Sequence, residues 1–191
     1  MTARPTTIEG GCLCGGVRYK VDFAADHDWK KAVRPLLHQH LIFITNNPRK
    51  PSTCQCTQCR KNSGALVYYL HAVQASELTW LSKSTLGEYQ SSAGCLRGFC
   101  NNCGSPLFWR KDQKDAEVEL AVGTFDEEYL LGGRDSEDKP TGAYAIALAN
   151  PDGHHSHLRN EIKGITDHVA VSGTKYWKTS SEGPPMSTTI F

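Results

Sequence analysis

The chain has 191 residues, with 21 basic and 20 acidic side chains and a formal net charge of +1. This length suits one domain with its own core, and the balanced charge argues against nucleic acid or an anionic membrane surface as the main partner. No stretch has the length of a membrane span, and the first residues, MTARPTTIEGG, lack the apolar region of a signal peptide. We therefore expect a soluble, cytoplasmic protein.

Five short segments predict a mainly β domain, because they are rich in β-branched or aromatic residues and bounded by Gly, Ser or Asn. In chain order they cover residues 17–21, 65–73, 78–81, 117–125 and 144–149. The stretch EVELAV within the fourth segment alternates polar and apolar residues, as a half-buried strand does.

Two segments interrupt the strands with a helical pattern. Residues 26–41 place their apolar side chains on one helical face, and an aspartate near their start could cap the helix. Pro35 lies inside this stretch and is expected to kink the helix or split it. Residues 125–133 predict one short helical turn that is capped by Asp126 and ended by glycine. The polar, proline-bearing residues 179–191 predict a tail that lies loosely on the surface.

The eight cysteines carry the strongest functional signal. They stand at positions 12, 14, 54, 56, 59, 95, 100 and 103. A chain of this length does not need disulfides to fold, and a reducing compartment would not keep them. We therefore expect the cysteines to bind metal or to perform thiol chemistry.

Two cysteine pairs, far apart in the sequence, predict a closed zinc site. Cys12 and Cys14 lie in GGCLCGG, and Cys100 and Cys103 lie in FCNNCGS. Each pair can turn around one metal ion, and the adjacent glycines let the backbone fold close to the sulfur atoms. We predict a structural four-thiolate site that ties the beginning of the chain to its middle. For any single cysteine, an apolar buried thiol without metal is the alternative.

The segment CQCTQC supplies three further thiolates close together, Cys54, Cys56 and Cys59. Three protein ligands with an open fourth position are typical of a catalytic zinc, where water or substrate completes the tetrahedron. The alternative is a second structural zinc that is closed by Cys95 or by a histidine. The ligand count favours the open site, which makes these three cysteines the candidate catalytic residues.

Several other side chains are candidates with two interpretations each. Arg60 and Lys61 directly follow the CQCTQC cysteines and could lower thiolate pKa values or bind a substrate carboxylate. Solvated charges at the end of a turn are the alternative for this pair, and Arg97 has the same two interpretations. The histidines at 154, 155 and 157 in DGHHSH could bind a metal, but a polar loop beside glycine favours solvated histidines.

Three blocks, GGCLCGGVRY, CQCTQCRKNSGA and RGFCNNCGSPLFW, follow one another in this order. With them, residues 9–125 resemble the glutathione-dependent formaldehyde-activating family (the centromere protein V/GFA domain), and a weaker likeness continues to Trp177. The resemblance implies a β-tent fold of antiparallel sheets with short helical insertions, stabilised by zinc. It also implies two zinc ions per chain, one on the first and last cysteine pairs and one on the three-cysteine segment.

The resemblance implies an activity as well. Members of the family join glutathione to formaldehyde to give S-hydroxymethylglutathione, and they are classed as carbon–sulfur lyases. We therefore expect a zinc-dependent enzyme whose partners are glutathione and formaldehyde or another small electrophile. Three thiolates around one dication leave a net negative charge, which favours sulfur chemistry over water activation. The alternative is a non-catalytic zinc module that carries glutathione or mediates a protein contact.

The sequence departs from the family pattern in three places. Gln55 stands where many relatives have histidine, at a position that is not a ligand. Residues 22–50 and 126–160 are longer than the usual links and could reshape the mouth of a pocket, within a domain expected to cover residues 1–178. Relatives use three cysteines at the second site, so Cys95 is predicted to be a free thiol more than ~4 Å from either metal, against ~2.3 Å for a zinc–sulfur bond.

Overall fold

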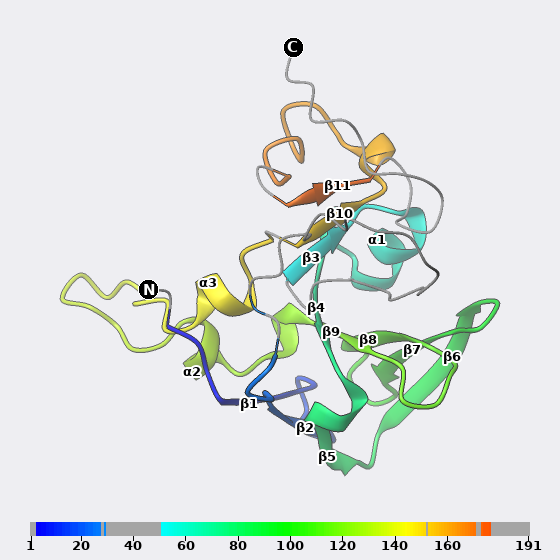
Figure 1. The fold of residues 1–191 in the computed structure, drawn as a ribbon, viewed down its shortest axis with the longest axis horizontal. Helices are drawn as coiled ribbons and strands as arrows, with labels where there is room; N and C mark the ends of the chain where they lie inside the picture. Colours follow the sequence, from blue (N-terminus) through cyan, green and yellow to red (C-terminus); the bar gives the residue numbers. More distant parts are fainter. Residues whose placement is uncertain (1–2, 28, 30–50, 152, 171–172, 177–191) are drawn as a thin grey trace, which may run out of the picture.

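The computed structural model of the chain describes residues 3–27, 29, 51–151, 153–170 and 173–176, and the strands in this part form two sheets (Figure 1). The small sheet has the strand order β1-β2-β5, and the large sheet has the order β11-β10-β3-β4-β9-β8-β7-β6. In chain order the strands are β1 (Thr7–Gly11), β2 (Val17–Asp22), β3 (Pro51–Cys54), β4 (Tyr68–Val73), β5 (Leu78–Lys83), β6 (Leu86–Ser92), β7 (Cys95–Cys100), β8 (Pro106–Lys111), β9 (Val118–Ala121), β10 (His154–Ser156) and β11 (Thr174–Lys175). The expected mainly β fold is confirmed.

The helical elements of the described residues are short. The α-helices are α1 (Thr57–Ser63), α2 (Glu127–Leu130) and α3 (Ala145–Leu148), and the 3-10 turns are η1 (Ala75–Glu77), η2 (Val122–Thr124) and η3 (Leu158–Asn160). None of the helices in the described ranges could span a membrane, since the longest of them, α1, has seven residues. The helix predicted over residues 26–41 and the tail at 179–191 lie almost wholly outside the described residues, so these two elements and the extent of the domain stay predictions.

Strand β2 shows why the small sheet forms. Its residues alternate between buried and half-exposed positions until its last residue, and Val17, Tyr19 and Val21 are fully buried. Such alternation turns one face of a strand toward a core and the other toward solvent. The predictions of strands over residues 17–21 and 78–81 are therefore confirmed, as β2 and β5.

The two faces of the large sheet have different surroundings. The inner face packs on the small sheet in one apolar core and includes Val73, Phe108 and Leu120. The outer face packs on α1 and includes Tyr68, Leu70 and Ala121. Strand β4, predicted within residues 65–73, contributes to both faces, so it separates the apolar core from the surface that carries α1.

A row of neighbouring residues crosses the outer face from strand to strand. Glu119 of β9 lies opposite Trp109 of β8, and Trp109 lies opposite Arg97 of β7. Directly opposed residues in a sheet project to the same side, and so do alternate residues of one strand. Because Glu119 and Ala121 are alternate residues of β9, the whole row belongs to the outer face. The fold thus places Arg97 on the side of the sheet where α1 packs.

The β10 edge of the large sheet is not antiparallel, which corrects the expectation that all strands of the fold pair in antiparallel sheets. All neighbours from β3 to β6 are antiparallel, but β10 runs parallel to both β3 and β11. His155 is paired with Thr53, and Ser156 is paired with Cys54. Tight hairpins impose antiparallel pairing, whereas a long connection allows either direction. The pairing brings part of the 126–160 insertion beside the strand that ends in Cys54.

The segment 144–149 is helical, so the prediction of a strand there is wrong. Its alternating alanines fit a strand pattern, but alanine is also the strongest helix former. One turn of helix is enough to bury Leu148 fully while Ile146 stays 65% exposed. The strand predicted over residues 117–125 is confirmed only for β9, because the following residues form η2.

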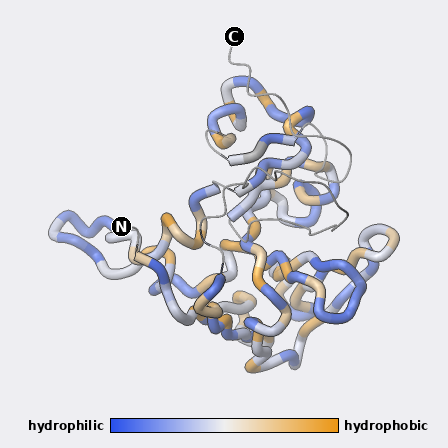
Figure 2. The backbone as a smooth tube through the Cα atoms, in the orientation of Figure 1, coloured by the Kyte–Doolittle hydropathy of each residue, from blue (hydrophilic) through white to orange (hydrophobic). Residues whose placement is uncertain are grey.

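Helix α2 confirms the predicted helical turn but not its cap. Asp126 stands at the N-cap position, yet its side chain makes no capping hydrogen bond. Both carboxylate oxygens instead accept hydrogen bonds from Arg18 of β2, at 2.7 and 2.5 Å, which ties α2 to the small sheet. Gly132 has a φ of +67° and ends the segment, as predicted. The loop that leads on to α3 is largely hydrophilic and extends away from both sheets (Figure 1, Figure 2).

Candidate functional site

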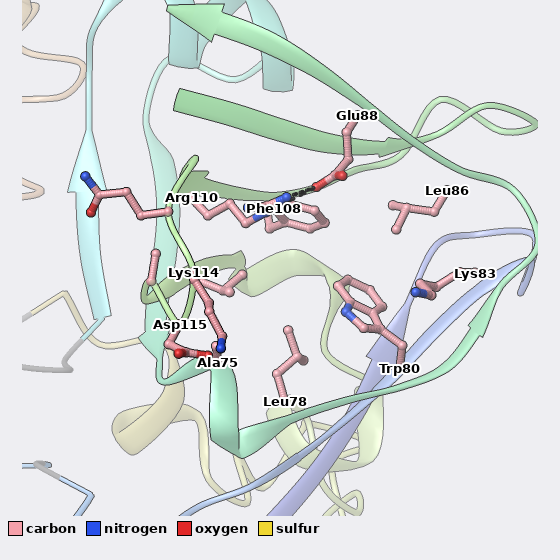
Figure 3. Close-up of a pocket in the computed structure, with 13 residues that line it drawn as sticks. Ala75, Leu78, Trp80, Lys83, Leu86, Glu88, Phe108, Arg110, Lys114 and Asp115 are labelled. Atoms are coloured by element: carbon pink, nitrogen blue, oxygen red, sulfur yellow. Dashed lines mark hydrogen bonds and ion pairs between the residues drawn. The ribbon is translucent and has the colours of Figure 1, made fainter. Parts of the chain in front are cut away.

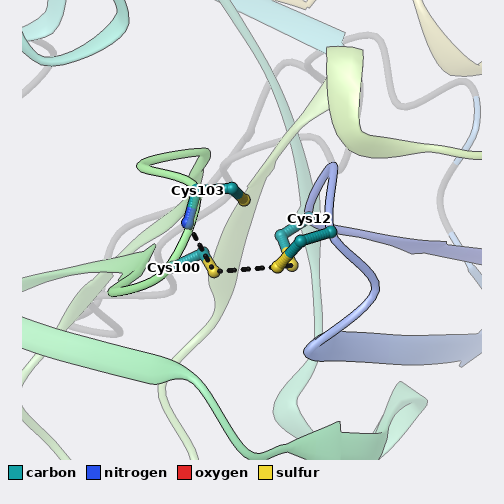
Figure 4. A group of neighbouring side chains, drawn as sticks. Cys12, Cys100 and Cys103 are labelled. Atoms are coloured by element: carbon teal, nitrogen blue, oxygen red, sulfur yellow. Dashed lines mark hydrogen bonds between the residues drawn. The ribbon is translucent and has the colours of Figure 1, made fainter.

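Four cysteines converge from two turns that face each other (Figure 4). Cys12 and Cys14 lie between β1 and β2, while Cys100 ends β7 and Cys103 lies in the turn before β8. Their sulfur atoms all lie within 4.8 Å of one another, and Cys14 Sγ is 3.5 Å from Cys12 Sγ and 3.6 Å from Cys100 Sγ. A zinc ion with four sulfur ligands at ~2.3 Å holds those sulfurs ~3.8 Å apart. The group therefore has the size of a four-thiolate zinc site.

The two turns are built alike. In each, the glycine directly after the second cysteine has a left-handed backbone, with a φ of +77° at Gly15 and +76° at Gly104. In each, the first sulfur accepts a backbone N–H, from Val17 at 3.2 Å in one turn and from Cys103 at 3.4 Å in the other. The backbone thus curls around each first sulfur, which leaves both sulfurs of a pair facing the other turn.

Two hydroxyl groups favour the thiolate forms of Cys103 and Cys100, whereas burial raises the pKa of Cys12. Ser105 Oγ lies 3.3 Å from Cys103 Sγ, and its hydrogen bond lowers the pKa of Cys103 to about 5. Thr85 Oγ1 lies 3.1 Å from Cys100 Sγ and lowers the pKa of that thiol. Ser105 Oγ also accepts the backbone N–H of Leu13 at 3.2 Å and so links the two turns. Because zinc binds cysteine as thiolate, these contacts fit a metal site.

Three cysteines form a second group on the outer face of the large sheet. Cys54 ends β3, Cys56 is the N-cap residue of α1, and Cys59 lies within α1. Their sulfur atoms all lie within 4.8 Å of one another. Among the described residues, no further Cys, His, Asp or Glu has a ligand atom within 4.8 Å of all three sulfurs, and His157 Nδ1 lies 3.6 Å from one of them, Cys54 Sγ. The donor set therefore fits a zinc ion with three protein ligands and an open fourth position.

Helix α1 brings two of these sulfur atoms together, those of Cys56 and Cys59. Cys56 Sγ accepts the backbone N–H of Cys59 at 3.2 Å, as an N-cap side chain does. Gly64 ends the helix with a φ of +74°. The sequence does not predict this helix, because TQCRKNS is short and has no apolar periodicity. One helical turn nevertheless explains why a three-residue spacing places the sulfurs of Cys56 and Cys59 within 4.8 Å of each other.

Arg97 is the cation that contacts the three-cysteine group. Its side chain is buried, with 3% of the residue exposed, and its Nη2 donates a hydrogen bond to Cys59 Sγ at 3.3 Å. The interpretation of Arg97 as a solvated charge is therefore wrong. A buried guanidinium requires a nearby negative charge or acceptor, and the Cys59 sulfur supplies an acceptor.

Arg60 and Lys61 lie in the last turn of α1 and therefore at the opposite end of the helix from Cys56. Lys61 is exposed, and Arg60 is half-buried with an Nε that has no hydrogen-bond partner among the described residues. Both cations are favourably placed for the helix dipole. Their proposed contact with a substrate carboxylate stays a prediction.

The sequence favours solvated histidines in a polar loop for DGHHSH, and the structure corrects this expectation. His154 and His155 belong to β10, and His155 is fully buried with Nδ1 2.7 Å from Thr53 Oγ1. His157 follows the strand with a left-handed φ of +62°, and its Nδ1 lies 3.6 Å from Cys54 Sγ. This placement depends on the parallel pairing of β10 with β3, for which the sequence has no local signal.

Gln55 points away from the three-cysteine group, as expected for a position that is not a ligand. It is 1% exposed, and its Oε1 accepts a hydrogen bond from Thr166 Oγ1 at 2.9 Å. Its backbone carbonyl also accepts a hydrogen bond from the Asn160 side chain at 3.0 Å. Gln55 thus anchors the metal-site segment to residues that follow β10.

Two residues near Arg97 were not singled out from the sequence. Burial and then repulsion by Glu117 raise the pKa of Glu119 to about 7, while Arg97 lowers it. Tyr68 is buried, and its hydroxyl has no hydrogen-bond partner among the described residues. The alternation in EVELAV does place Glu119 on the polar side of its strand, but only the strand order shows that this side faces Arg97.

We expect Cys95→Ala to keep two zinc ions per chain. Cys95 begins β7, is half-buried and belongs to neither group of converging ligand atoms. All eight cysteines lie in the described part of the chain, and none of them forms a disulfide. Metal analysis of the purified variant tests this expectation. Loss of the zinc that a chelator removes more easily would identify Cys95 as its fourth ligand and would contradict the open site.

A cleft of about 350 Å³ lies between the two sheets, away from the three-cysteine group (Figure 3). Its apolar lining includes Leu78, Trp80 and Phe108. Glu88 and Arg110 also line it and form an ion pair at 3.0 Å. Phe108 belongs to the inner face, and the residues lining the cleft include no cysteine or histidine. The candidate chemistry is therefore on the other face of the large sheet.

The similarity of the chain to known proteins identifies its family. Residues 41–141, just over half of the chain, match the family described as glutathione-dependent formaldehyde-activating enzyme. The match includes the three-cysteine group and the second cysteine pair. No curated protein matches the chain. A crystal structure of a Rhodobacter sphaeroides protein is similar at 19% identity, with a TM-score of 0.42, over 69% of this chain and 94% of that chain, a likeness too slight to bear on the site. By its family match, the chain belongs to the glutathione-dependent formaldehyde-activating enzyme family.

Proposed function

We propose that the protein is a zinc-dependent enzyme of the carbon–sulfur lyase type, which combines glutathione with formaldehyde or another small electrophile. One observation carries this proposal: three cysteine sulfurs converge on the outer face, and among the described residues no fourth ligand atom lies within 4.8 Å of all three. A site of this kind keeps one position for a substrate. The family to which the chain belongs supports glutathione and formaldehyde as the substrates.

In this proposal Cys54, Cys56 and Cys59 hold the catalytic zinc. When bound, the zinc supplies an acidic coordination position at which a thiol gives up its proton. Three thiolate ligands leave a net negative charge, so a substrate sulfur at this position keeps its nucleophilic character. Arg97 partly balances this charge from the protein side, through its hydrogen bond to Cys59.

The addition of the thiol to the aldehyde requires no other reactant. The thiol loses its proton, its sulfur forms a bond to the carbonyl carbon, and the carbonyl π electrons move to the oxygen. The released proton ends on that oxygen, so the thiol and the aldehyde combine to give a hemithioacetal, which for glutathione and formaldehyde is S-hydroxymethylglutathione. The same steps in reverse cleave the adduct, as the lyase classification requires.

The remaining predicted residues have supporting roles in the proposal. Cys12, Cys14, Cys100 and Cys103 hold a structural zinc, because their converging sulfurs join the small sheet to the β7–β8 turn and two of them, Cys12 and Cys100, belong to the main core. Arg60 and Lys61 attract the carboxylates of glutathione, because Lys61 is exposed and Arg60 is half-buried within a few residues of Cys59.

The test is the rate at which glutathione, formaldehyde and their adduct reach equilibrium. We expect zinc-loaded protein in catalytic amounts to increase this rate over the uncatalysed reaction, as followed by NMR with carbon-13-labelled formaldehyde. We further expect a chelator to remove one zinc faster than the other and to abolish the acceleration, because an open site exchanges its ligands more readily.

The same measurements distinguish an enzyme from a binding module. An unaccelerated reaction, together with two zinc ions that resist the chelator equally, would contradict the proposal and would favour a non-catalytic zinc module. A panel of other small aldehydes with glutathione, and of other thiols with formaldehyde, defines which electrophile and which thiol the site prefers.

A further inference from the structure

Each sulfur of the three-cysteine group faces one nitrogen atom of the protein. Cys56 Sγ accepts the backbone N–H of Cys59 at 3.2 Å, and Cys59 Sγ accepts Nη2–H of Arg97 at 3.3 Å. Cys54 Sγ lies 3.6 Å from His157 Nδ1. The three nitrogens come from a helix, from strand β7 and from the residue after β10. Of the three, the guanidinium of Arg97 is the permanent cation.

Among the described residues, the hydrogen bond that Arg97 makes through its guanidinium goes to the Cys59 sulfur. Arg97 is 3% exposed, and neither its Nε nor its Nη1 has a hydrogen-bond partner among the described residues. On the two neighbouring strands it lies opposite Tyr89 and Trp109, and Glu119, whose pKa Arg97 lowers, lies one strand further along the same row. The hydrogen bond to Cys59 is the contact by which Arg97 reaches the three-cysteine group, and together with the nearby Glu119 carboxyl group it offsets the cost of burying this cation.

A hydrogen bond from a cation changes what the sulfur can do. It withdraws electron density from the thiolate, and the nucleophilicity of a thiolate falls as its basicity falls, with a Brønsted coefficient of ~0.4–0.5. An opposite charge in contact typically changes the basicity of a neighbouring group by ~1–3 pKa units. Together these values correspond to a roughly three- to thirtyfold slower attack of that sulfur on an electrophile.

This matters because the proposed reaction brings an electrophile to a centre with several sulfurs. A substrate thiol in the open position would be one sulfur among four, and the other three belong to the protein. An electrophile that combined with a protein ligand would block the site. The enzyme therefore needs the substrate sulfur to be the most reactive of the four.

We propose that Arg97 is a positioning residue that makes the Cys59 sulfur less reactive toward electrophiles, so that the electrophile combines with the substrate sulfur. This proposal rests on the proposed function for its biological purpose. The contact itself and its effect on Cys59 stand on the geometry alone. Arg97 acts through Cys59 and is not required to touch the substrate.

The test is alkylation of zinc-loaded protein by iodoacetamide, in which the sulfur–carbon bond forms and iodide leaves. Peptide mass spectrometry follows each cysteine separately. In Arg97→Met, which removes the donor and the charge but keeps an unbranched side chain, we expect the Cys59 rate to rise three- to thirtyfold. The rates at Cys54 and Cys56 are expected to change less than twofold. Arg97→Lys keeps the charge without the planar fork and is expected to restore part of the protection.

Matched controls separate this effect from a looser fold. Arg110→Gln removes an arginine from the neighbouring strand β8. The ion-pair partner of Arg110 is Glu88, so this variant is expected to leave the alkylation rate of Cys59 unchanged. Zinc content is measured in every variant, and in cobalt-substituted protein the sulfur-to-metal charge-transfer band should shift in Arg97→Met but not in Arg110→Gln. If Arg97→Met does not fold, Arg97→Lys provides the test, with a smaller rise at Cys59.

The result that overturns the proposal is an unchanged Cys59 rate in Arg97→Met or Arg97→Lys protein that still holds two zinc ions. An equal rise at all three cysteines would also overturn it, because that pattern indicates general opening of the site. Alkylation requires neither glutathione nor formaldehyde. A protein that is inactive toward both substrates but shows the selective rise at Cys59 would therefore refute the proposed function and leave the role of Arg97 intact.

Discussion

Cys103→Ser is expected to abolish the folded state. Cys103 belongs to the four-cysteine group, in which Cys12 and Cys100 are part of the main apolar core. Serine is a poor zinc ligand, so the substitution would remove the proposed ion that joins the small sheet to the β7–β8 turn. Structural zinc contributes ~10–16 kcal/mol in small zinc-finger peptides, against a net stability of ~5–15 kcal/mol for a typical domain. The loss of cooperative thermal unfolding, followed by circular dichroism, checks this result.

Cys95→Ser is the matched control for that experiment. It makes the same chemical change on β7, the strand that ends in Cys100, but at a residue that belongs to neither group. The control is expected to unfold cooperatively near the wild-type temperature and to keep its zinc. A soluble Cys103→Ser protein with a normal cooperative transition would show that this group is not the structural site.

Cys56→Ser is expected to fold, to lose one zinc ion and to become at least ~100-fold less active. Even the mutation of a residue that only supports a metal ligand lowers metal affinity or activity roughly 10- to 100-fold. The fold should survive because Cys56 is a half-buried N-cap residue on the outer face, away from the main core. Serine is itself a preferred N-cap residue and can accept the same backbone N–H from Cys59. Only the metal ligand would then be lost.

Metal content, thermal unfolding and the glutathione–formaldehyde rate, measured together on Cys56→Ser, check this expectation. The informative comparison is with Cys103→Ser. If both variants collapsed to the same extent, the assignment of one structural and one catalytic site would be wrong. A Cys56→Ser protein that kept full activity with one zinc would place the chemistry elsewhere.

The metal groups could be predicted from the sequence because their geometry is mostly local. A spacing of one or two residues confines two sulfurs to a short distance in any fold, so Cys12–Cys14 and Cys100–Cys103 each had to act as a unit. The structure brings the same sets together that the spacing predicts. Whether each set holds zinc stays a prediction of the donor chemistry.

The surroundings of the three-cysteine group could not be predicted in this way. Arg97 reaches Cys59, 38 positions away in sequence, only because β7 lies in the sheet with Arg97 on its outer face. His157 reaches Cys54, 103 positions away, only because β10 joins β3 in parallel. Both contacts depend on strand pairing between distant segments, and neither segment carries a local pattern that fixes its partner.

The errors in the fold have a similar origin. Strand β2 was predictable because its alternation matches a single interpretation. The segment 144–149 was not, since alternating alanines and large apolar residues satisfy a strand and a short helix equally well. The burial of Leu148 against the exposure of Ile146 decides for the helix, and burial is a property of the assembled core.

The four-cysteine group also has a consequence for the speed of folding. It joins Cys14 to Cys100, which are 86 positions apart, so the ion would close a chain loop that contains all of Cys54, Cys56, Cys59 and Arg97. Closing a loop of this size costs entropy, and folds with such long-range contacts form slowly. A metal ion captured early by the two turns would remove that cost from the later steps. Metal supply during synthesis would then govern how fast the rest of the chain, the second metal group included, reaches its final arrangement.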